Sequence, residues 1–173
     1  EDFTNLERLD CFDNNLVTLD VSQNANLERL DCGINQLTSL DVTNNTALSH
    51  LQCGQNQLNS LDVSYNLGLW LLDIRNQQIT SIDVSQNTML HQFWCANNQL
   101  SSLDLTYNTF LYWVNCGMNQ LTSLDVSQNS NLEKLDCCWN QITSLDVSGN
   151  SILRSLTCHS NPLTYLNVAN GID

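Results

Sequence analysis

The sequence predicts a β-rich solenoid of about eight 21-residue coils, with stacked parallel strands on two faces and little or no helix. Segments such as LERLDC and LTSLDVS alternate apolar and polar residues, which is typical of short strands. A fixed period of this size is the sequence signature of stacked repeats. The period itself is read from leucines that recur every 21 residues without insertion: Leu6, Leu27, Leu48, Leu69, Leu90, Leu111, Leu132 and Leu153.

Composition limits both the domain count and the partners. The chain has 173 residues, 42% of them hydrophobic, so we expect one domain over residues 1–173. Five Lys and Arg against eighteen Asp and Glu give a formal charge of −13, which repels phosphate backbones and argues against nucleic acid. No run approaches the roughly 18 apolar residues of a membrane helix, so we expect no membrane insertion. Because the sequence begins at Glu1 without an initiator Met, we expect a processed protein or a fragment of a longer one.

Each period reads LxxLxCxxNxLTSLDVSxN. This pattern resembles the leucine-rich repeat family, whose core is LxxLxLxxN/CxL and whose period is about 20 to 29 residues. The resemblance covers nearly the whole chain, and the LTSLDVSxN half is similar to the short 21-residue bacterial subclass. It implies a solenoid with parallel sheets, a usual role in binding or adhesion, and a secreted or cell-surface location. It names no ligand.

Residues 21 apart lie about 4.8 Å apart in a stacked coil, so the sequence can be read as columns. The alternation sends one column inward: Leu9, Leu30, Leu51, Leu72, Phe93, Val114, Leu135 and Leu156. A second inward column holds Cys11, Cys32, Cys53, Cys95, Cys116, Cys137 and Cys158, with Ile74 in the remaining place. We interpret these as buried free thiols, because zinc needs converging ligands and disulfides need suitably angled Cβ vectors. Cys138 is predicted to face outward beside His159, as a reactive or pairing thiol.

Two asparagine columns and one aspartate column also repeat. We expect the asparagine amides to satisfy backbone groups that the turns leave unpaired. One column comprises Asn14, Asn35, Asn56, Asn98, Asn119, Asn140 and Asn161, interrupted by Gln77, and the other runs from Asn24 to Asn150. The outward carboxylates are Asp20, Asp41, Asp62, Asp83, Asp104, Asp125 and Asp146. Hydrogen bonding is favoured over calcium to offset their repulsion, because no DxDxDG-type loop occurs.

The outward positions of the first strand vary most. The first, second and seventh coils read NLERLDC, NLERLDC and NLEKLDC, whereas the centre reads ALSHLQC, GLWLLDI, MLHQFWC and FLYWVNC. This replacement predicts an aromatic patch about 15 to 20 Å long over four coils. Tyr65, Tyr107 and Phe110 lie in the preceding turns and extend it. The candidate binding residues are His50, Trp70, Leu71, Arg75, His91, Trp94, Tyr112, Trp113 and Asn115.

Aromatic and arginine anchors among polar residues are typical of interface hot spots, which favours a protein or peptide partner. Glycans are an alternative, since Trp and Tyr faces stack on sugar rings. A third reading is that the aromatics only shield the sheet or cover a flanking segment. A structural module that self-assembles as a dimer or end to end is also open, because the ends lack clear polar caps.

The sequence holds no evident catalytic site, so we predict a protein that is not an enzyme and has no cofactor. Nucleophile motifs, GxGxxG, Walker A and paired CxxC spacings do not occur in it. Asp73 and His91 are an acid–base pair that adjacent coils could bring together. A flat strand face lacks the water-excluding pocket that such a pair needs.

Overall fold

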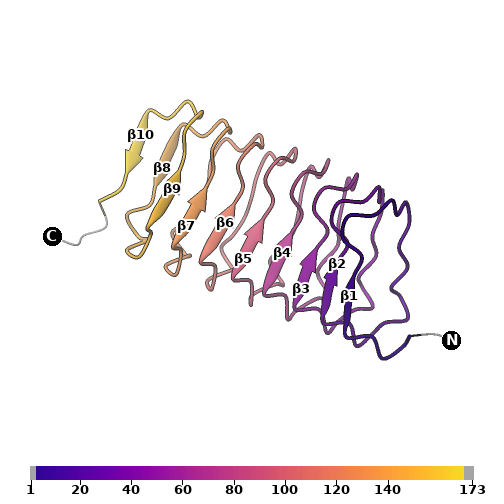
Figure 1. Cartoon of the computed structure of the whole chain (residues 1–173). Helices are drawn as coiled ribbons and strands as arrows, with labels where there is room; N and C mark the ends of the chain where they lie inside the picture. Colours follow the sequence, from indigo (N-terminus) through magenta and orange to yellow (C-terminus); the bar gives the residue numbers. More distant parts are fainter. Residues whose placement is uncertain (1–2, 170–173) are drawn as a thin grey trace.

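The computed structural model describes residues 3–169, which form a solenoid with the two termini at opposite ends (Figure 1). Its regular elements are ten strands of three residues, and the described part contains no helix. The fold class expected from the 21-residue period is confirmed. The strands are β1 Arg8–Asp10, β2 Arg29–Asp31, β3 His50–Gln52, β4 Leu71–Asp73, β5 Gln92–Trp94, β6 Trp113–Asn115, β7 Lys134–Asp136, β8 Ser144–Asp146, β9 Ser155–Thr157 and β10 Tyr165–Asn167.

Eight of these strands form one parallel sheet in the order β1-β2-β3-β4-β5-β6-β7-β9. Each strand pairs with the next at a register of 21 residues, so that Leu72 of β4 lies opposite Phe93 of β5. Side chains at equivalent positions therefore stack in columns along the sheet, as the sequence predicts. We call its outward side the sheet face.

The second extended segment of each coil is less regular than the first. It forms a ladder only where β8 pairs with β10, in the last two coils. In the earlier coils one backbone bond joins neighbours, for example from the Gln57 N–H to the Leu37 carbonyl at 2.8 Å. The aspartate of each segment also bonds locally: Asp62 Oδ1 accepts the Ser64 N–H at 2.9 Å. That amide is then satisfied within its own coil.

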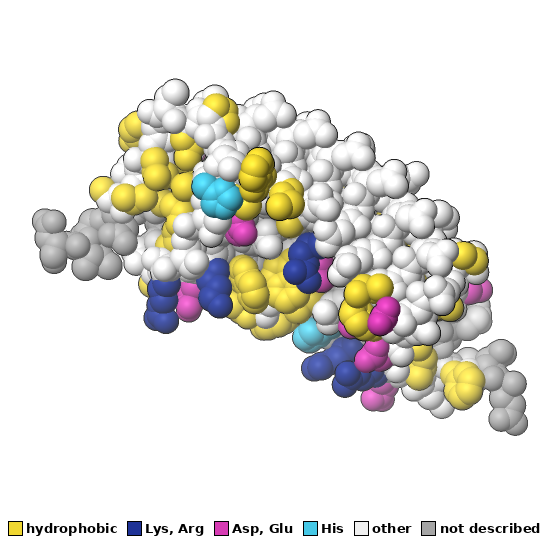
Figure 2. All heavy atoms as spheres, turned by 45° about the horizontal axis from the view of Figure 1, so that its top comes forward, with side chains coloured by type: hydrophobic (Ala, Val, Ile, Leu, Met, Phe, Trp, Pro, Cys, Tyr) yellow, Lys and Arg dark blue, Asp and Glu magenta, His cyan; other side chains and the backbone are white. Residues whose placement is uncertain are grey.

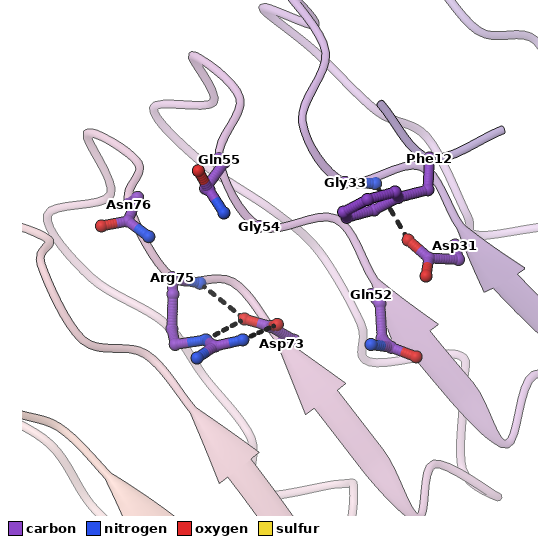
Figure 3. A pocket seen from close by; sticks show the side chains of 9 residues that line it. All are labelled: Phe12, Asp31, Gly33, Gln52, Gly54, Gln55, Asp73, Arg75 and Asn76. Carbon is purple, nitrogen blue, oxygen red and sulfur yellow. Dashed lines mark hydrogen bonds and ion pairs between the residues drawn. The ribbon is translucent and has the colours of Figure 1, made fainter. Parts of the chain in front are cut away.

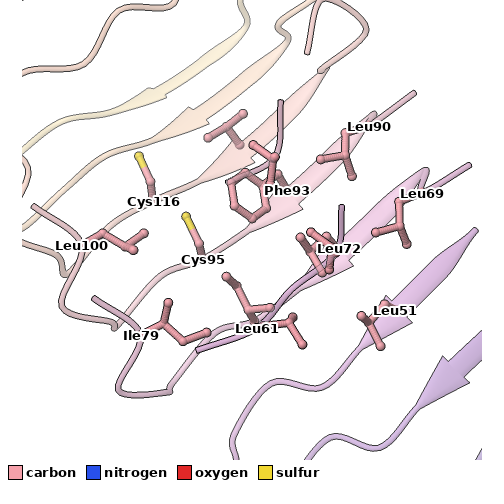
Figure 4. Close-up of a cluster of buried hydrophobic side chains, with 14 of the residues drawn as sticks. Leu51, Leu61, Leu69, Leu72, Ile79, Leu90, Phe93, Cys95, Leu100 and Cys116 are labelled. Carbon is pink, nitrogen blue, oxygen red and sulfur yellow. The ribbon is translucent and has the colours of Figure 1, made fainter. Parts of the chain in front are cut away.

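The inward columns form one continuous hydrophobic core (Figure 4). Phe93 is the largest fully buried side chain, and Leu72 and Val114 flank it in the same column. All eight cysteines are free thiols. Burial raises the pKa of Cys32 to about 12 and that of Cys53 well above its ordinary value, so these thiols stay protonated. The interpretation of the inward cysteines as small hydrophobic groups is confirmed.

The asparagine columns tie neighbouring coils together. Asn119 Oδ1 accepts the Leu100 N–H at 3.0 Å, while its Nδ2 donates to the carbonyls of Cys95 and Cys116, each at 3.1 Å. Gln77 takes the same place in its coil and bonds to the Leu58 N–H and the Cys53 carbonyl. The predicted structural role of these amides is confirmed.

The aspartate column is exposed and hydrogen-bonded. In every coil from Asp20 to Asp146 the carboxylate accepts the N–H of the residue two positions further along. At Asp62 the backbone and then the hydroxyl of Ser64 lower the carboxyl pKa. The expectation that hydrogen bonds offset the repulsion is confirmed.

Candidate binding face

The central coils of the sheet face carry a stack of aromatic rings. His50 and Trp70 lie with their ring centroids 5.4 Å apart, and Trp70 and His91 follow at 5.3 Å. Phe110, from the turn before β6, continues the stack on His91 at 5.6 Å. The ring centroids of Tyr112 and Trp70 lie 6.1 Å apart with the rings tilted, and the Tyr112 hydroxyl accepts a hydrogen bond from the Gln92 amide. The stack thus joins four successive coils.

A second aromatic pair lies beside this stack, in β5 and β6. Trp94 and Trp113 pack edge to face, with their ring centroids 4.8 Å apart. The Arg75 guanidinium lies 4.9 Å from the Trp94 ring centroid, and the Lys134 ammonium lies 4.7 Å from that of Trp113. A cation thus contacts each indole of this pair. We call the seven rings the aromatic band: His50, Trp70, His91, Trp94, Phe110, Tyr112 and Trp113.

Arg75 is fixed by a bidentate ion pair. Its Nε lies 2.9 Å from Asp73 Oδ1 and one terminal nitrogen lies 2.7 Å from Asp73 Oδ2. The Arg75 backbone N–H also donates to Asp73 Oδ1 at 3.0 Å. This pairing offsets the burial of Asp73, which is only 5% exposed, and the bond to Asp73 raises the pKa of Arg75. The acid–base pair considered from the sequence does not form, because His91 Nδ1 contacts the Met89 carbonyl at 2.7 Å.

All nine residues chosen from the sequence lie in or beside the sheet face, but none is fully exposed. Leu71 was expected to be presented outward, yet it is only 7% exposed, because neighbouring side chains cover it. Asn115 is half-buried and accepts the Gly117 N–H at 3.3 Å. Of the turn aromatics, Phe110 joins the ring stack, whereas Tyr65 and Tyr107 are exposed and make no ring contact with other described residues.

The prediction of an exposed, reactive Cys138 is wrong. Its side chain is only 7% exposed, because it occupies the space that Gly117 leaves open in the preceding coil. Burial and then a hydrogen bond with Asp136 raise the Cys138 pKa to about 11. This thiol is therefore protonated at neutral pH.

The sheet face also gathers the basic residues of the protein. Figure 2 shows Lys and Arg side chains on either side of an apolar area. Arg8, Arg29 and Lys134 lie in β1, β2 and β7. Arg75 lies over Trp94 of the aromatic band, and Arg154 contacts Glu133 at 3.8 Å. These five are all the Lys and Arg of the sequence. The exposed column from Asp20 to Asp146, in contrast, is purely acidic.

Two hollows, which the sequence reasoning missed, lie where the strands of the sheet end. Hollow 1, of about 80 Å³, lies between Phe12 and Arg75 over Gly33 and Gly54 (Figure 3). Hollow 2, of about 230 Å³, lies between Arg75 and Cys138 over Ala96 and Gly117. The signal was visible in the sequence, because this column of the repeat holds two consecutive small residues, Gly33 and Gly54, between the large Phe12 and Arg75, and two more, Ala96 and Gly117, after Arg75.

The described residues hold no group of three or more His, Cys, Asp or Glu that could bind a metal ion. Within residues 3–169, no helix has the length and apolarity that crossing a membrane requires.

No protein-family model matches the sequence, and no curated protein matches it. Among solved structures, the functional domain of InlJ from Listeria monocytogenes is 34% identical over 95% of this chain, with a TM-score of 0.56. A leucine-rich-repeat protein of Leptospira interrogans is 26% identical over 92% of the chain, with a TM-score of 0.87. This chain is a leucine-rich repeat protein.

The chain spans 48% of the InlJ structure and 44% of the Leptospira structure. Internalin C2 of Listeria monocytogenes, 23% identical over 91% of the chain and 73% of its own, shares the fold with a TM-score of 0.85. The InlJ domain is described as including a cysteine ladder. The column of buried cysteines in this leucine-rich repeat protein is a similar feature.

Proposed function

We propose that this leucine-rich repeat protein is a non-enzymatic binding or adhesion module that recognises a protein or peptide through the aromatic band. The observation that supports this most is that aromatic residues replace the ERLDC sequence of the terminal coils in the central coils alone. Large aromatic side chains with a neighbouring arginine are the residues that dominate binding energy in interfaces.

The comparison of coils within the chain argues against a merely protective role for the rings. In β2 and β7 the sheet face carries Arg29 or Lys134 beside acidic neighbours, and the strands pair there as regularly as in the centre. The sheet therefore does not need aromatic cover to form. Side chains that the scaffold does not require are available for recognition.

The distribution of charge favours binding of a partner at the sheet face over the aspartate column. The sheet face combines the five cations with acidic neighbours, whereas the aspartate column presents seven carboxylates and no cation. A partner with patches of both signs is attracted to the sheet face, and an acidic partner is repelled from the aspartate column. We expect such a module to work in a secreted or cell-surface protein.

The proposal is tested by selecting peptides from a random displayed library and measuring their dissociation constants on three proteins. We expect the double variant Trp94→Ala with Trp113→Ala to weaken binding at least about tenfold, since each hot-spot truncation costs 2 kcal/mol or more. The matched control is Trp139→Ala, because Trp139 is exposed but lies in the turn after β7, outside the aromatic band. Equal affinity for all three proteins would overturn the proposal.

A glycan array distinguishes the other class of ligand. Binding to an immobilised glycan that depends on Trp94 and Trp113, with no peptide selected, would replace the protein partner by a saccharide. In both cases circular dichroism at matched concentration must show that the double variant is folded.

Self-association is the second candidate, favoured by a specific observation at one end of the solenoid. A hollow of about 190 Å³ lined by Leu153, Leu156 and Val168 lies beside the edge strand β9, and Leu166 is 43% exposed. An apolar edge of this kind can pair with another copy. Sedimentation velocity of wild type and of Leu166→Lys tests it: a concentration-dependent oligomer that the variant abolishes supports stacking, and a monomer throughout contradicts it.

A further inference from the structure

Hollow 1 lies beside the aromatic band and contains a carboxylate without a cation. Its volume of about 80 Å³ is several times the roughly 10–15 Å³ that one water needs, so a small polar group fits. Phe12 and Asp31 stand on one side, and the Asp73–Arg75 pair stands on the other (Figure 3). Gln52 lies between them, and its side-chain amide makes no hydrogen bond within the described part of the chain.

The protein itself contains a filled version of this arrangement, two coils further along. Asp73 Oδ1 accepts the N–H of residue 75 at 3.0 Å, and Asp31 Oδ1 accepts the N–H of residue 33 at 3.1 Å. The two carboxylates thus occupy equivalent positions in the repeat. At position 75 an arginine closes over the carboxylate, whereas Gly33 leaves Asp31 uncovered, and no ion pair with Asp31 occurs among residues 3–169.

An aromatic ring lies beside the carboxylate both at the Asp73–Arg75 pair and in hollow 1. The Arg75 guanidinium contacts the carboxylate of Asp73 and the ring of Trp94 together. In hollow 1 the aromatic wall is Phe12, whose Cδ2 lies 3.2 Å from where a Cβ of Gly33 would be. A planar cation bound to Asp31 can therefore lie against a ring, as Arg75 does.

The floor and the charge of hollow 1 suit an incoming cation. A Cβ at Gly54 would approach Asp73 Oδ1 to 3.0 Å, so glycine keeps this space open. Burial is the largest cause that raises the pKa of Asp31, and the carboxylates of Asp10 and Asp73 raise it further. The Gly33 N–H and the more weakly acting Arg8 lower it, but the net result is a raised pKa. Binding a cation offsets this unfavourable charge.

We propose that hollow 1 binds the guanidinium group of an arginine side chain, held by the Asp31 carboxylate and the Phe12 ring. The inference rests on the proposed function in one respect, namely that the arginine belongs to the protein or peptide partner. It adds the chemistry of one partner residue and its place beside the aromatic band.

The test uses a small probe, so that it does not depend on a partner being known. Wild-type protein labelled with ¹⁵N is titrated with N-acetyl-L-arginine methylamide, and we expect saturable shifts of the Gly33 and Gly54 amides and of the Gln52 side chain. Asp31→Asn should weaken this binding at least about tenfold, because it replaces charge-assisted hydrogen bonds to the guanidinium by weaker neutral ones. Asn115, in the same column, already accepts the N–H two residues further along, so asparagine suits this position.

Controls separate the site from general electrostatics. Asp10→Asn removes a carboxylate one coil earlier, outside hollow 1, and should weaken binding less than about fivefold, because it acts only through screened charge. N-acetyl-L-lysine methylamide should bind several-fold more weakly, because an ammonium cannot form the bidentate pair. Equal binding of the two probes, an equal effect of Asp10→Asn and Asp31→Asn, or the absence of saturable shifts would each overturn the proposal.

Failure of this inference is distinguishable from failure of the proposed function. The double variant Trp94→Ala with Trp113→Ala leaves every residue that lines hollow 1 in place, and it should still bind the arginine probe. Peptides whose binding depends on the two tryptophans but not on Asp31 would support the proposed function and contradict the arginine site.

Discussion

The asparagine columns should account for a large part of the stability of this protein, and Asn119→Ala tests this. The substitution leaves the Leu100 N–H without a partner. It also removes one of the two amide donors at each of the Cys95 and Cys116 carbonyls, which keep their bonds to Asn98 and Asn140. An unsatisfied buried backbone group costs about 1–3 kcal/mol. Because the truncation makes room for water, we use the lower half of that range. The Leu100 N–H then costs about 1–2 kcal/mol and each of the two lost carbonyl bonds about 0.5–1 kcal/mol. The free energy of unfolding should therefore fall by about 2–4 kcal/mol, a large part of the roughly 5–15 kcal/mol of a typical domain.

The assay is urea denaturation followed by circular dichroism, with two comparison variants. Asn131→Ala removes one exposed bond to the preceding coil, at the Thr109 carbonyl, and should cost less than about 1 kcal/mol. Asn119→Gln should give an intermediate loss, since Gln77 keeps only two of these bonds at its own position. A loss below about 1 kcal/mol for Asn119→Ala, or a loss no larger than that of Asn131→Ala, would refute the reasoning.

Three further predictions follow from the same contacts. Gln77→Asn should raise the free energy of unfolding by about 1 kcal/mol, measured by the same denaturation, because asparagine regains the bond to its own coil; a decrease would contradict this. Hydrogen bonding lowers the folded-state pKa of Asp62, so its charge stabilises the protein above the unfolded pKa of about 4 and loses this effect as pH falls through the folded pKa. Wild type should exceed Asp62→Asn in stability by more at pH 7 than at pH 3, and an equal difference would count against it. Met118 is exposed at φ 55°, a conformation in which asparagine is several-fold enriched, so Met118→Asn should raise the thermal midpoint by an amount equivalent to about 0.5–1 kcal/mol; a lower midpoint would contradict this.

The sequence predicts the backbone of this fold well, because a constant period forces residues 21 apart into columns. Period-two alternation then decides which columns face inward, so the burial of Leu72 and Phe93 and of the cysteines could be derived without coordinates. The asparagine bonds could also be anticipated, since a column of amides in tight turns has few other partners. These inferences need only the register and no side-chain detail.

Contacts between side chains of neighbouring coils were harder to predict. Leu71 and Cys138 point outward as the alternation requires, yet both are covered, because their exposure depends on the size of the residues stacked above and below them. The position of Lys134 over Trp113 depends on a long, flexible side chain, which the period does not specify. Hollow 1 was missed because it is defined by Gly33 and Gly54, where side chains are absent.

The central claim is that ligands bind the sheet face over the central coils, and mapping a bound peptide by NMR tests it most directly. A library-selected peptide is added to ¹⁵N-labelled protein, and the backbone amide signals that move are assigned. The account predicts the largest shifts in β3 to β6, between His50 and Asn115, and in the Trp94 and Trp113 indoles. Shifts confined to the column from Asp20 to Asp146, with β3 to β6 unchanged, would contradict it.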